Sequence, residues 1–515
     1  MTIDEQLSSI KTTQAASDLP VLDLETTGQI RVYPRSVQHV DGMSLFMGRE
    51  GDGKSLFLFY RDMGSRYAGL FHAESTKEIE TGILSRCPLT HQNADAVRQM
   101  LDFTRPILIG LDTSIGLGDR LGLANPGHLQ AVEGTDIRPV LAQQSIRELE
   151  RTERTPEEVM DAATWAVLQE GYEGGFGSDA DHLKTPEHID LMMQAGFTMF
   201  TIDPGDHVVN EADSLPVGEL DVTGLAWDVL EDTPEHFSSR YADRKLPVSA
   251  RLTLEPTEED VLRALVKYGN VLIHTVKMAG YLHERYPDSP TELELSVDET
   301  ESVTSPFEHF MVVNELKRLG IELVSLAPRF VGDFEKGIDY KGDLELFKEE
   351  FLKHVDIAEH LGPYKISFHS GSDKFQVYEL VGSLGEGRIH VKTAGTSYLE
   401  ALRTVALVDP QFFREILDFS RGLYDTEKRT YHVSADPGKV RPSDGYADEE
   451  LTELFDQDDA RQVLHVTFGR VLTEKDPAGN YIFRERLAAL LQHHEEEHYD
   501  ILRRHFRRHI EPFIQ

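Results

Sequence analysis

The chain has 515 residues, of which 40% are hydrophobic and 28% charged, so it is globular in composition and too long for one ordinary core. It carries 90 acidic and 52 basic side chains, and its formal net charge of −38 repels phosphate backbones. We therefore expect no nucleic-acid partner, and an anionic substrate would need a local cluster of Arg and Lys.

Residues 1–100 are predicted to form a mostly β module, because runs such as 44–48 and 55–60 are short, aromatic-rich and strand-like. The first twenty residues lack the apolar stretch of a secretory signal, and no segment of the chain is apolar enough to span a membrane. The single cysteine, Cys87, forms no internal disulfide and excludes cysteine-based zinc sites. These features favour the reducing cytoplasm.

Residues 48–55, GREGDGKS, match the P-loop pattern. A P-loop runs from a strand into a helix, whose N-terminus holds the phosphate. Here the following segment, 55–60, reads as a strand instead. The motif is therefore interpreted as the turn of a β-hairpin.

From residue 101 to 435, short apolar runs alternate with amphipathic segments, which predicts a TIM-type (β/α)8 barrel. A turn-rich insertion is expected around 211–257, followed by a helix over 257–286. Residues 436–515 are predicted to be a helical extension packed on the barrel, with a charged terminal helix over 484–510. The eight expected strands are 106–112, 138–144, 177–182, 199–204, 293–299, 321–330, 364–370 and 388–393.

Three of these strands carry polar residues on one parity, although parallel strands buried on both faces are normally apolar throughout. The polar sets are Glu294, Ser296 and Asp298, then Lys365, Ser367 and His369, and finally Arg388, His390 and Lys392. Polar side chains that face inward near the C-terminal ends of barrel strands indicate an active site. Satisfied buried networks or solvent-facing edge strands would give the same pattern.

His182, His369 and His390 close or nearly close three expected strands, and such ends converge on one pocket. Imidazoles combined with a carboxylate suit Zn, Mn, Co or Ni, so we predict a divalent metal site. The TIDPGDH segment adds Asp203, Asp206 and His207, which fit either the same site or a strand-end turn. The HExxH match at 494–498 is interpreted as the solvated face of a terminal helix rather than a zinc site.

Two carboxylates are placed for acid–base work: Asp181, beside His182, and Glu294, on the interior parity of its strand. Asp298 and Glu299 compete with Glu294 for this role. Residues expected to bind an anionic substrate are Arg120, in a glycine-rich loop, Arg329, Lys365, Lys374, Lys392 and, as a polar neighbour, Asp298.

Several long segments resemble the tagaturonate epimerase family, also called tagaturonate/fructuronate epimerases. They are residues 150–184, 196–208, 295–306, 335–344, 365–375 and 390–401. The resemblance covers about residues 105–510 and is looser in the first hundred.

The resemblance implies a metal-dependent interconversion of D-tagaturonate and D-fructuronate in hexuronate catabolism, without NAD or ATP. It implies that Asp181 is the proton acceptor and Glu294 the proton donor, with His182 and His369 as metal ligands. His390 as a third ligand comes from strand parity alone.

The two uronates differ at the carbinol β to the ketone, whose C–H is not acidified by the carbonyl. We therefore expect retro-aldol cleavage and re-addition, with the metal as Lewis acid. Hydride transfer is the rival route, but no GxGxxG follows an expected strand.

Two other functions are compatible with the sequence. One is another metal-dependent ketose epimerase or a class II-type sugar aldolase. The other is a sugar-acid-binding or P-loop regulatory protein. The expected partner is a small sugar acid, and the sequence is compatible with an oligomer.

Overall fold

The computed structural model describes residues 3–11, 19–24, 28–51, 53–61, 65–79, 82–298 and 300–514. Its centre is a closed barrel of eight parallel strands that follow one another in chain order. Since all eight run the same way, their C-terminal ends share one mouth. The strands are β8 (Ser114–Leu117), β9 (Arg138–Ser145), β10 (Gly177–Leu183), β11 (Met199–Ile202), β14 (Glu292–Ser296), β15 (Ser325–Ala327), β16 (Lys365–Phe368) and β17 (Ile389–Thr393).

Helices connect the barrel strands, which confirms the predicted alternation. They are α3 (Asn125–Val132), α4 (Ile146–Thr152), α5 (Pro156–Glu170), α6 (Pro186–Gln194), α8 (Glu258–Arg285), α9 (Pro306–Arg318), α10 (Leu344–Leu361), α11 (Phe375–Leu384) and α12 (Thr396–Val408). The helix predicted over 257–286 is confirmed as α8. It begins where Thr257 and Asp260 form a capping box that satisfies the first backbone N–H groups. The insertion before it holds α7 (Pro234–Tyr241) and a small ribbon of β12 (Leu246–Pro247) and β13 (Thr253–Leu254).

The first predicted barrel strand, 106–112, is wrong. The strand is β8, a few residues later, and 106–112 runs across the N-terminal ends of the other strands. The Ile107 amide donates to the carbonyl of Phe176, just before β10, and the amide of Gly110 donates to Glu292 at the start of β14. This segment closes the floor of the barrel, and it has the same apolar residue types as a barrel strand, so composition does not distinguish the two.

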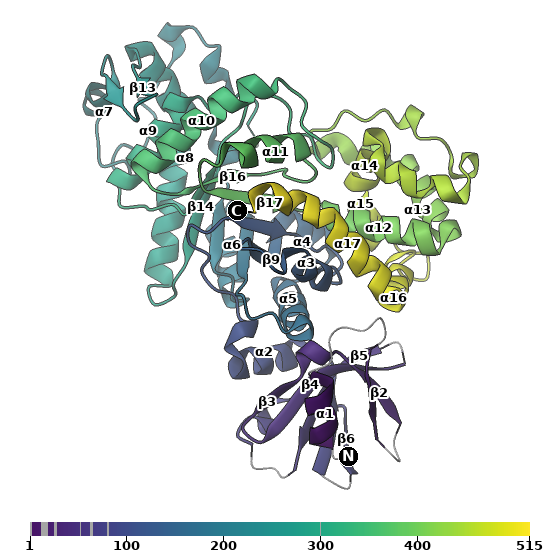
Figure 1. The fold of residues 1–515 in the computed structure, drawn as a ribbon. Coiled ribbons are helices and arrows are strands. Elements are labelled where there is room, and N and C mark those ends of the chain that lie inside the picture. The colour runs from purple at the N-terminus through teal and green to yellow at the C-terminus, as the bar shows by residue number, and fades with distance from the viewer. Residues whose placement is uncertain are drawn as a thin grey trace.

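The N-terminal part is an antiparallel sheet, seen below the barrel in Figure 1. It consists of β1 (Val21–Asp23), β2 (Gln29–Val32), β3 (Gln38–Val40), β4 (Met43–Glu50), β5 (Gly53–Tyr60), β6 (Ser75–Ile79) and β7 (Gly82–Cys87), with α1 (Ile3–Lys11) and α2 (His91–Met100). Along β4, Leu45 and Phe46 alternate between two apolar clusters, one of which reaches Trp165 on α5. Helix α2 also packs against α5.

The P-loop motif is a hairpin, as predicted. Gly48 pairs with Ser55 and Glu50 pairs with Gly53 across the antiparallel strands β4 and β5. Asp52, within the motif, lies outside the described residues. No helix follows the turn, so its amides do not form a phosphate cradle of the P-loop kind.

The C-terminal helices have an apolar cluster of their own and lie on the right in Figure 1. They are α13 (Pro410–Glu427), α14 (Asp458–Val466), α15 (Phe468–Thr473), α16 (Arg484–His493) and α17 (Glu495–Ile510). The predicted helix over 484–510 is therefore two helices that meet at His494. Helix α17 packs against α3 of the barrel.

The solvated face predicted for residues 494–498 is confirmed for Glu496 and Glu497, which are exposed, but it is wrong for Glu495 and His498, which are buried. Glu495 accepts hydrogen bonds from Tyr33 and Arg49 and pairs with Lys54 at 2.7 Å. The N-terminal sheet thus covers this end of α17. Among the described residues, no helix is both long and apolar enough to cross a membrane.

Candidate active site

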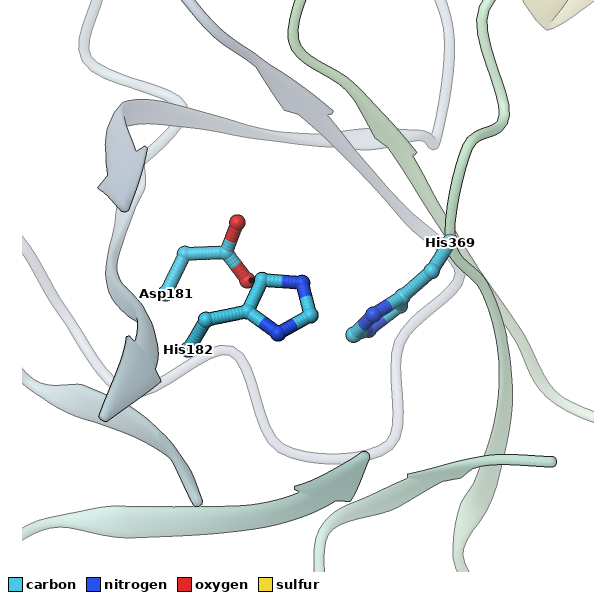
Figure 2. Close-up of side chains that lie close together, drawn as sticks. All are labelled: Asp181, His182 and His369. Carbon is cyan, nitrogen blue, oxygen red and sulfur yellow. Dashed lines mark ion pairs between the residues drawn. The ribbon is translucent and has the colours of Figure 1, made fainter. Parts of the chain in front are cut away.

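Asp181 and His182 lie near the C-terminal end of β10, and both point toward His369, which directly follows β16, as Figure 2 shows. Consecutive residues of a regular strand point to opposite faces. Here His182 has a φ of 55°, and the register between β10 and β11 shifts between Ala180 and Leu183. Left-handed backbone at a non-glycine residue persists only where its surroundings hold it, and it clusters at functional sites. The turn brings two potential ligands from adjacent positions into one pocket.

The donor atoms of Asp181, His182 and His369 lie within 4.8 Å of one another. Each histidine is oriented by a carboxylate: His182 Nδ1 lies 3.1 Å from Asp203, and His369 Nδ1 lies 3.1 Å from Asp298. Carboxylates in this position fix the tautomer and the ring direction of metal-binding histidines. Two imidazoles and a carboxylate are a donor set that suits Zn, Mn, Co or Ni.

Negative charge dominates around His369. Burial and Lys392 oppose protonation of the ring, but Asp298 and Glu294 outweigh them and raise the pKa of His369 to about 9. The ring therefore sits where a positive charge is strongly favoured. A divalent cation would satisfy the same excess of carboxylates, so the residues fit a metal.

The ammonium group of Lys392, on β17, lies among three carboxylates inside the barrel. Its Nζ is 2.7 Å from Asp179, 2.8 Å from Asp181 and 2.7 Å from Glu294. Burial alone would lower the pKa of Lys392, but the three carboxylates raise it well above its ordinary value. Lys392 therefore holds these three carboxylates in place with one fixed positive charge.

The three carboxylates differ in their proton affinity. Burial raises the pKa of Asp179 to about 6; Lys392 opposes this shift, and Asp181 and Glu294 add to it. Burial also acts against ionised Asp181, but His182, Lys392 and His369 outweigh it and lower its pKa. Burial likewise opposes ionised Glu294, and Lys392 and His369 lower its pKa well below the usual range. An ionised Asp181 suits a proton acceptor, whereas Glu294 must gain a proton before it can donate one.

Two neighbouring cavities with shared lining residues lie beside this cluster. The smaller one, of about 50 Å³, is lined by Asp181, His182 and His369 together with residues of the barrel rim, and we call it the inner pocket. We call outer pocket the adjoining cavity of about 470 Å³. The inner pocket is lined by Arg120, Gln143, Ser145, Arg147, Glu148, Asp181, His182, Lys336, His369, Ser370, Ser372, Lys392, Ala394, Gly395, Tyr431 and His465. The outer pocket shares Lys336, His369, Ser370 and Tyr431 with it and adds Asp298, Thr300, Glu301, Pro328, Arg329, Phe330, Phe334 and His432.

The predicted substrate-binding residues are thus divided among three places. Arg120 and Lys392 line the inner pocket, while Arg329 and Asp298 line the outer one. Lys365 lines neither, because its buried Nζ donates to Ser114 lower in the barrel.

Lys374 is buried outside both pockets. Its ammonium group donates to three backbone carbonyls, those of Ser372, Glu335 and Ile338. It therefore anchors the loop after β16 and does not face either pocket.

His390 is not in the donor group with His182 and His369. It pairs with Ser114 on β8 and lies one interior layer below, where its Nδ1 is 2.9 Å from the Ser114 hydroxyl. Burial is the main cause of a pKa well below its ordinary value. Its role as third ligand stays a prediction.

The TIDPGDH cluster is split. Asp203 orients His182, whereas Asp206 is exposed and pairs with Lys184, and His207 stacks on His274. Glu299, named as a rival acid, lies outside the described residues.

Several site residues were missed from the sequence. Asp179 has the same parity as Asp181, so the alternation rule applied to Glu294 would have found it. Gln143 faces inward from β9, and His465 comes from α14, more than 70 residues beyond the last barrel strand. No local pattern marks His465, because only the packing of the C-terminal helices brings it to the pocket.

A family model described as tagaturonate epimerase matches residues 33–513 of the chain. The tagaturonate/fructuronate epimerase of Thermotoga maritima is 40% identical over 480 residues, which cover 93% of this chain and 96% of that one. A native crystal structure of the fructuronate-tagaturonate epimerase from Cohnella laeviribosi matches with a TM-score of 0.87 at 36% identity, covering 95% of this chain and 97% of that one. A form with one glycerol matches with a TM-score of 0.86 at 36% identity, over 94% and 96%. The likeness extends over the N-terminal sheet, the barrel and the C-terminal helices.

Proposed function

Because the chain belongs to the tagaturonate epimerase family, we propose that it interconverts D-tagaturonate and D-fructuronate with the help of a divalent metal ion. It is an enzyme of the isomerase class. The metal and the mechanism are supported by one observation: Asp181, His182 and His369 meet at one cavity, and His369 is in direct contact with the buried Glu294. We assign the barrel to the TIM type, since helices follow its strands and the polar groups lie at the C-terminal strand ends.

In this proposal His182 and His369 hold the ion, and Asp181 borders it. Bound there, a Zn, Mn, Co or Ni ion supplies Lewis acidity for the negative charge that develops on the substrate oxygens. Asp203 and Asp298 keep the two imidazoles turned toward the pocket. Asp181 has two oxygens, so it can border a cation and still accept a proton.

The epimers differ at a carbinol carbon β to the ketone, so inversion requires that a bond to this carbon be broken. Asp181, ionised under the charges of Lys392 and both histidines, takes the hydroxyl proton of this carbon. The bond to the α-carbon then breaks: its electron pair stays on the ketone side as an enediolate, and the carbinol carbon becomes an aldehyde. After the aldehyde turns, the same bond re-forms on its other face.

In the direction in which Asp181 takes the hydroxyl proton, Glu294 supplies the proton that the new hydroxyl needs. In the reverse direction the two residues exchange these roles. Glu294 contacts both His369 and Lys392, so any change in their charge changes its proton affinity. Asp179, with its pKa of about 6, is a neighbouring reservoir for this proton.

The test is a product assay with D-tagaturonate, first after EDTA treatment and then after addition of Mn, Co, Ni or Zn. We expect D-fructuronate to form only when metal is present. Activity that survives complete chelation would contradict the metal, and absence of product under all conditions would contradict the activity. Running the reaction in D₂O tests the mechanism, because retro-aldol chemistry leaves no deuterium on the inverted carbon.

A further inference from the structure

Basic side chains surround one end of the inner pocket, although the chain as a whole has a net charge of −38. Burial raises the pKa of Tyr431, and Arg120, Arg151 and Arg147 oppose that shift. Burial, reinforced by Arg120, Lys336 and Arg461, holds the pKa of His465 well below its ordinary value. Both side chains therefore lie in a positive local potential that is opposite in sign to the charge of the protein.

Arg120 is held rigidly at this end. The side chain is 4% exposed. Its guanidinium lies 3.6 Å from the ring centre of Phe468 and directs Nε and Nη2 to one oxygen of Glu148 at 2.9 and 2.7 Å. Within the described part of the chain, Nη1 has no hydrogen-bond partner. An arginine fixed on one side and unpaired on the other is oriented to bind a further anion.

Two more buried side chains of the inner pocket are unpaired among the described residues. Both amide atoms of Gln143 and both ring nitrogens of His465 have no hydrogen-bond partner there. Buried polar groups nearly always have a hydrogen-bond partner, because leaving one unpaired is destabilising. Three such side chains around one cavity indicate a ligand with several hydrogen-bonding oxygens.

The ring of His465 is held in place by the backbone of the barrel rim. A Cβ at Gly395 would collide with its Cε1 atom, and Gly337 lies on the same ring. These glycines let α14 bring the imidazole to the cavity wall. Since burial and the surrounding cations keep it neutral, it offers one N–H donor and one acceptor.

We propose that Arg120, Gln143 and His465 form the subsite that binds the carboxylate end of the sugar acid, with Arg147 and Lys336 adding positive charge. This inference rests on the proposed function and adds to it. Asp181 and His369 line the same inner pocket, so a substrate anchored by its carboxylate presents its carbinol carbon to them. The C-terminal helices thereby contribute to substrate recognition through His465.

The subsite also explains how the cleaved substrate stays bound. When the bond between the α-carbon and the carbinol carbon breaks, the carboxylate remains on the aldehyde fragment. That fragment must turn about a single bond before it re-adds. An anchored carboxylate keeps it in the cavity while the aldehyde group exposes its other face.

The outer pocket is a weaker candidate for this role. Its arginine, Arg329, directs Nη1 to the backbone carbonyls of Phe330 at 3.3 Å and Gly332 at 3.1 Å and lies near Asp333. Part of its hydrogen-bonding capacity is thus already used within its own loop.

Two small probes test the subsite without turnover. D-Glycerate has the same three carbons as glycerol but ends in a carboxylate, so calorimetry of both on the metal-loaded enzyme isolates the contribution of that group. We expect wild type to bind glycerate at least tenfold more tightly than glycerol. Arg120→Met should weaken glycerate binding by about tenfold to a hundredfold, the range of a charge-assisted hydrogen bond, and leave glycerol binding nearly unchanged.

Arg120→Lys controls for folding, because it keeps a cation beside Glu148 and removes Nη1. It should also lose most of the preference for glycerate, at an unchanged melting temperature. Equal binding of the two probes by wild type, or a preference that survives in both Arg120 variants, would overturn the subsite. So would a preference abolished by Arg329→Met alone. A wild type that binds glycerate but never epimerises D-tagaturonate would refute the proposed function and not the subsite.

Discussion

The Nε2 atom of His369 lies 2.7 Å from Oε1 of Glu294, so the candidate metal ligand and the candidate proton donor are in direct contact. Both side chains are buried, where charges interact strongly. The proton on Glu294, the charge on His369 and the binding of a cation are therefore coupled. Occupation of the metal site should set the acid–base state of the pocket.

Metal binding should depend on pH. His369 has a pKa raised to about 9, so below that value a metal must displace its proton. The affinity for Mn or Co should rise with pH, by up to about tenfold per unit between pH 6 and 9, and then level off. Titrations of metal-free enzyme at several pH values measure this slope. A slope of zero would mean that the ion is not bound by His369.

The same histidine should affect the stability of the metal-free chain. Its folded-state pKa is raised above the unfolded value of about 6.5. The proton therefore adds stability fully below about pH 6.5, and this contribution is lost as the pH rises through about 9. Urea unfolding from pH 6 to 9 should show this decline in wild type and a smaller one in His369→Gln. Identical declines would contradict the raised pKa.

Asp181→Asn should abolish most of the epimerase activity. The amide keeps the shape of the side chain but cannot accept the hydroxyl proton, so kcat should fall by about 10²–10⁴-fold. Asp288→Asn, at an exposed position after α8, is the matched control and should keep wild-type activity. A loss of less than tenfold in Asp181→Asn, with metal bound, would assign the base to another residue.

Lys392→Met should shift the pH profile of the enzyme. The ammonium group stabilises the ionised forms of Asp179, Asp181 and Glu294, so its removal should raise their pKa values. The acidic limb of kcat/KM should then move to higher pH, and Lys392→Arg should restore part of the shift. An unchanged profile with lower activity would indicate that Lys392 contacts substrate instead of organising the carboxylates.

Glu495→Gln should weaken the attachment of the N-terminal sheet. The buried carboxylate pairs with Arg49 and Lys54, and the substitution removes the negative charge that these two cations share. Breaking a buried pair in this way should cost about 3 kcal/mol of unfolding free energy. Glu497→Gln, two residues along the same helix in an exposed pair with His494, should cost less than about 1 kcal/mol. Equal losses would mean that the buried cluster is not stabilising.

Much of the candidate site could be predicted from local patterns. The interior parity of β14, β16 and β17 placed Glu294, His369 and Lys392 inside the barrel. Alternation along a strand follows from the pleat, which needs no knowledge of distant residues. The strand predicted over 106–112 rested on apolar composition instead, and it was wrong because apolar residues that close the floor of a barrel and those that line its wall have the same composition.

The sequence by itself determined the alternation of strands and helices, the helix that starts at Thr257, and the polar groups at the strand ends. The tertiary structure decided which of these groups meet. The left-handed backbone at His182 directs the side chains of Asp181 and His182 toward the same pocket. Closure of the barrel placed Lys392 beside Asp181, 211 positions away along the chain. It also brought His465 to the rim and buried Glu495. Pleat and capping act over a few residues, whereas these contacts depend on how whole elements pack.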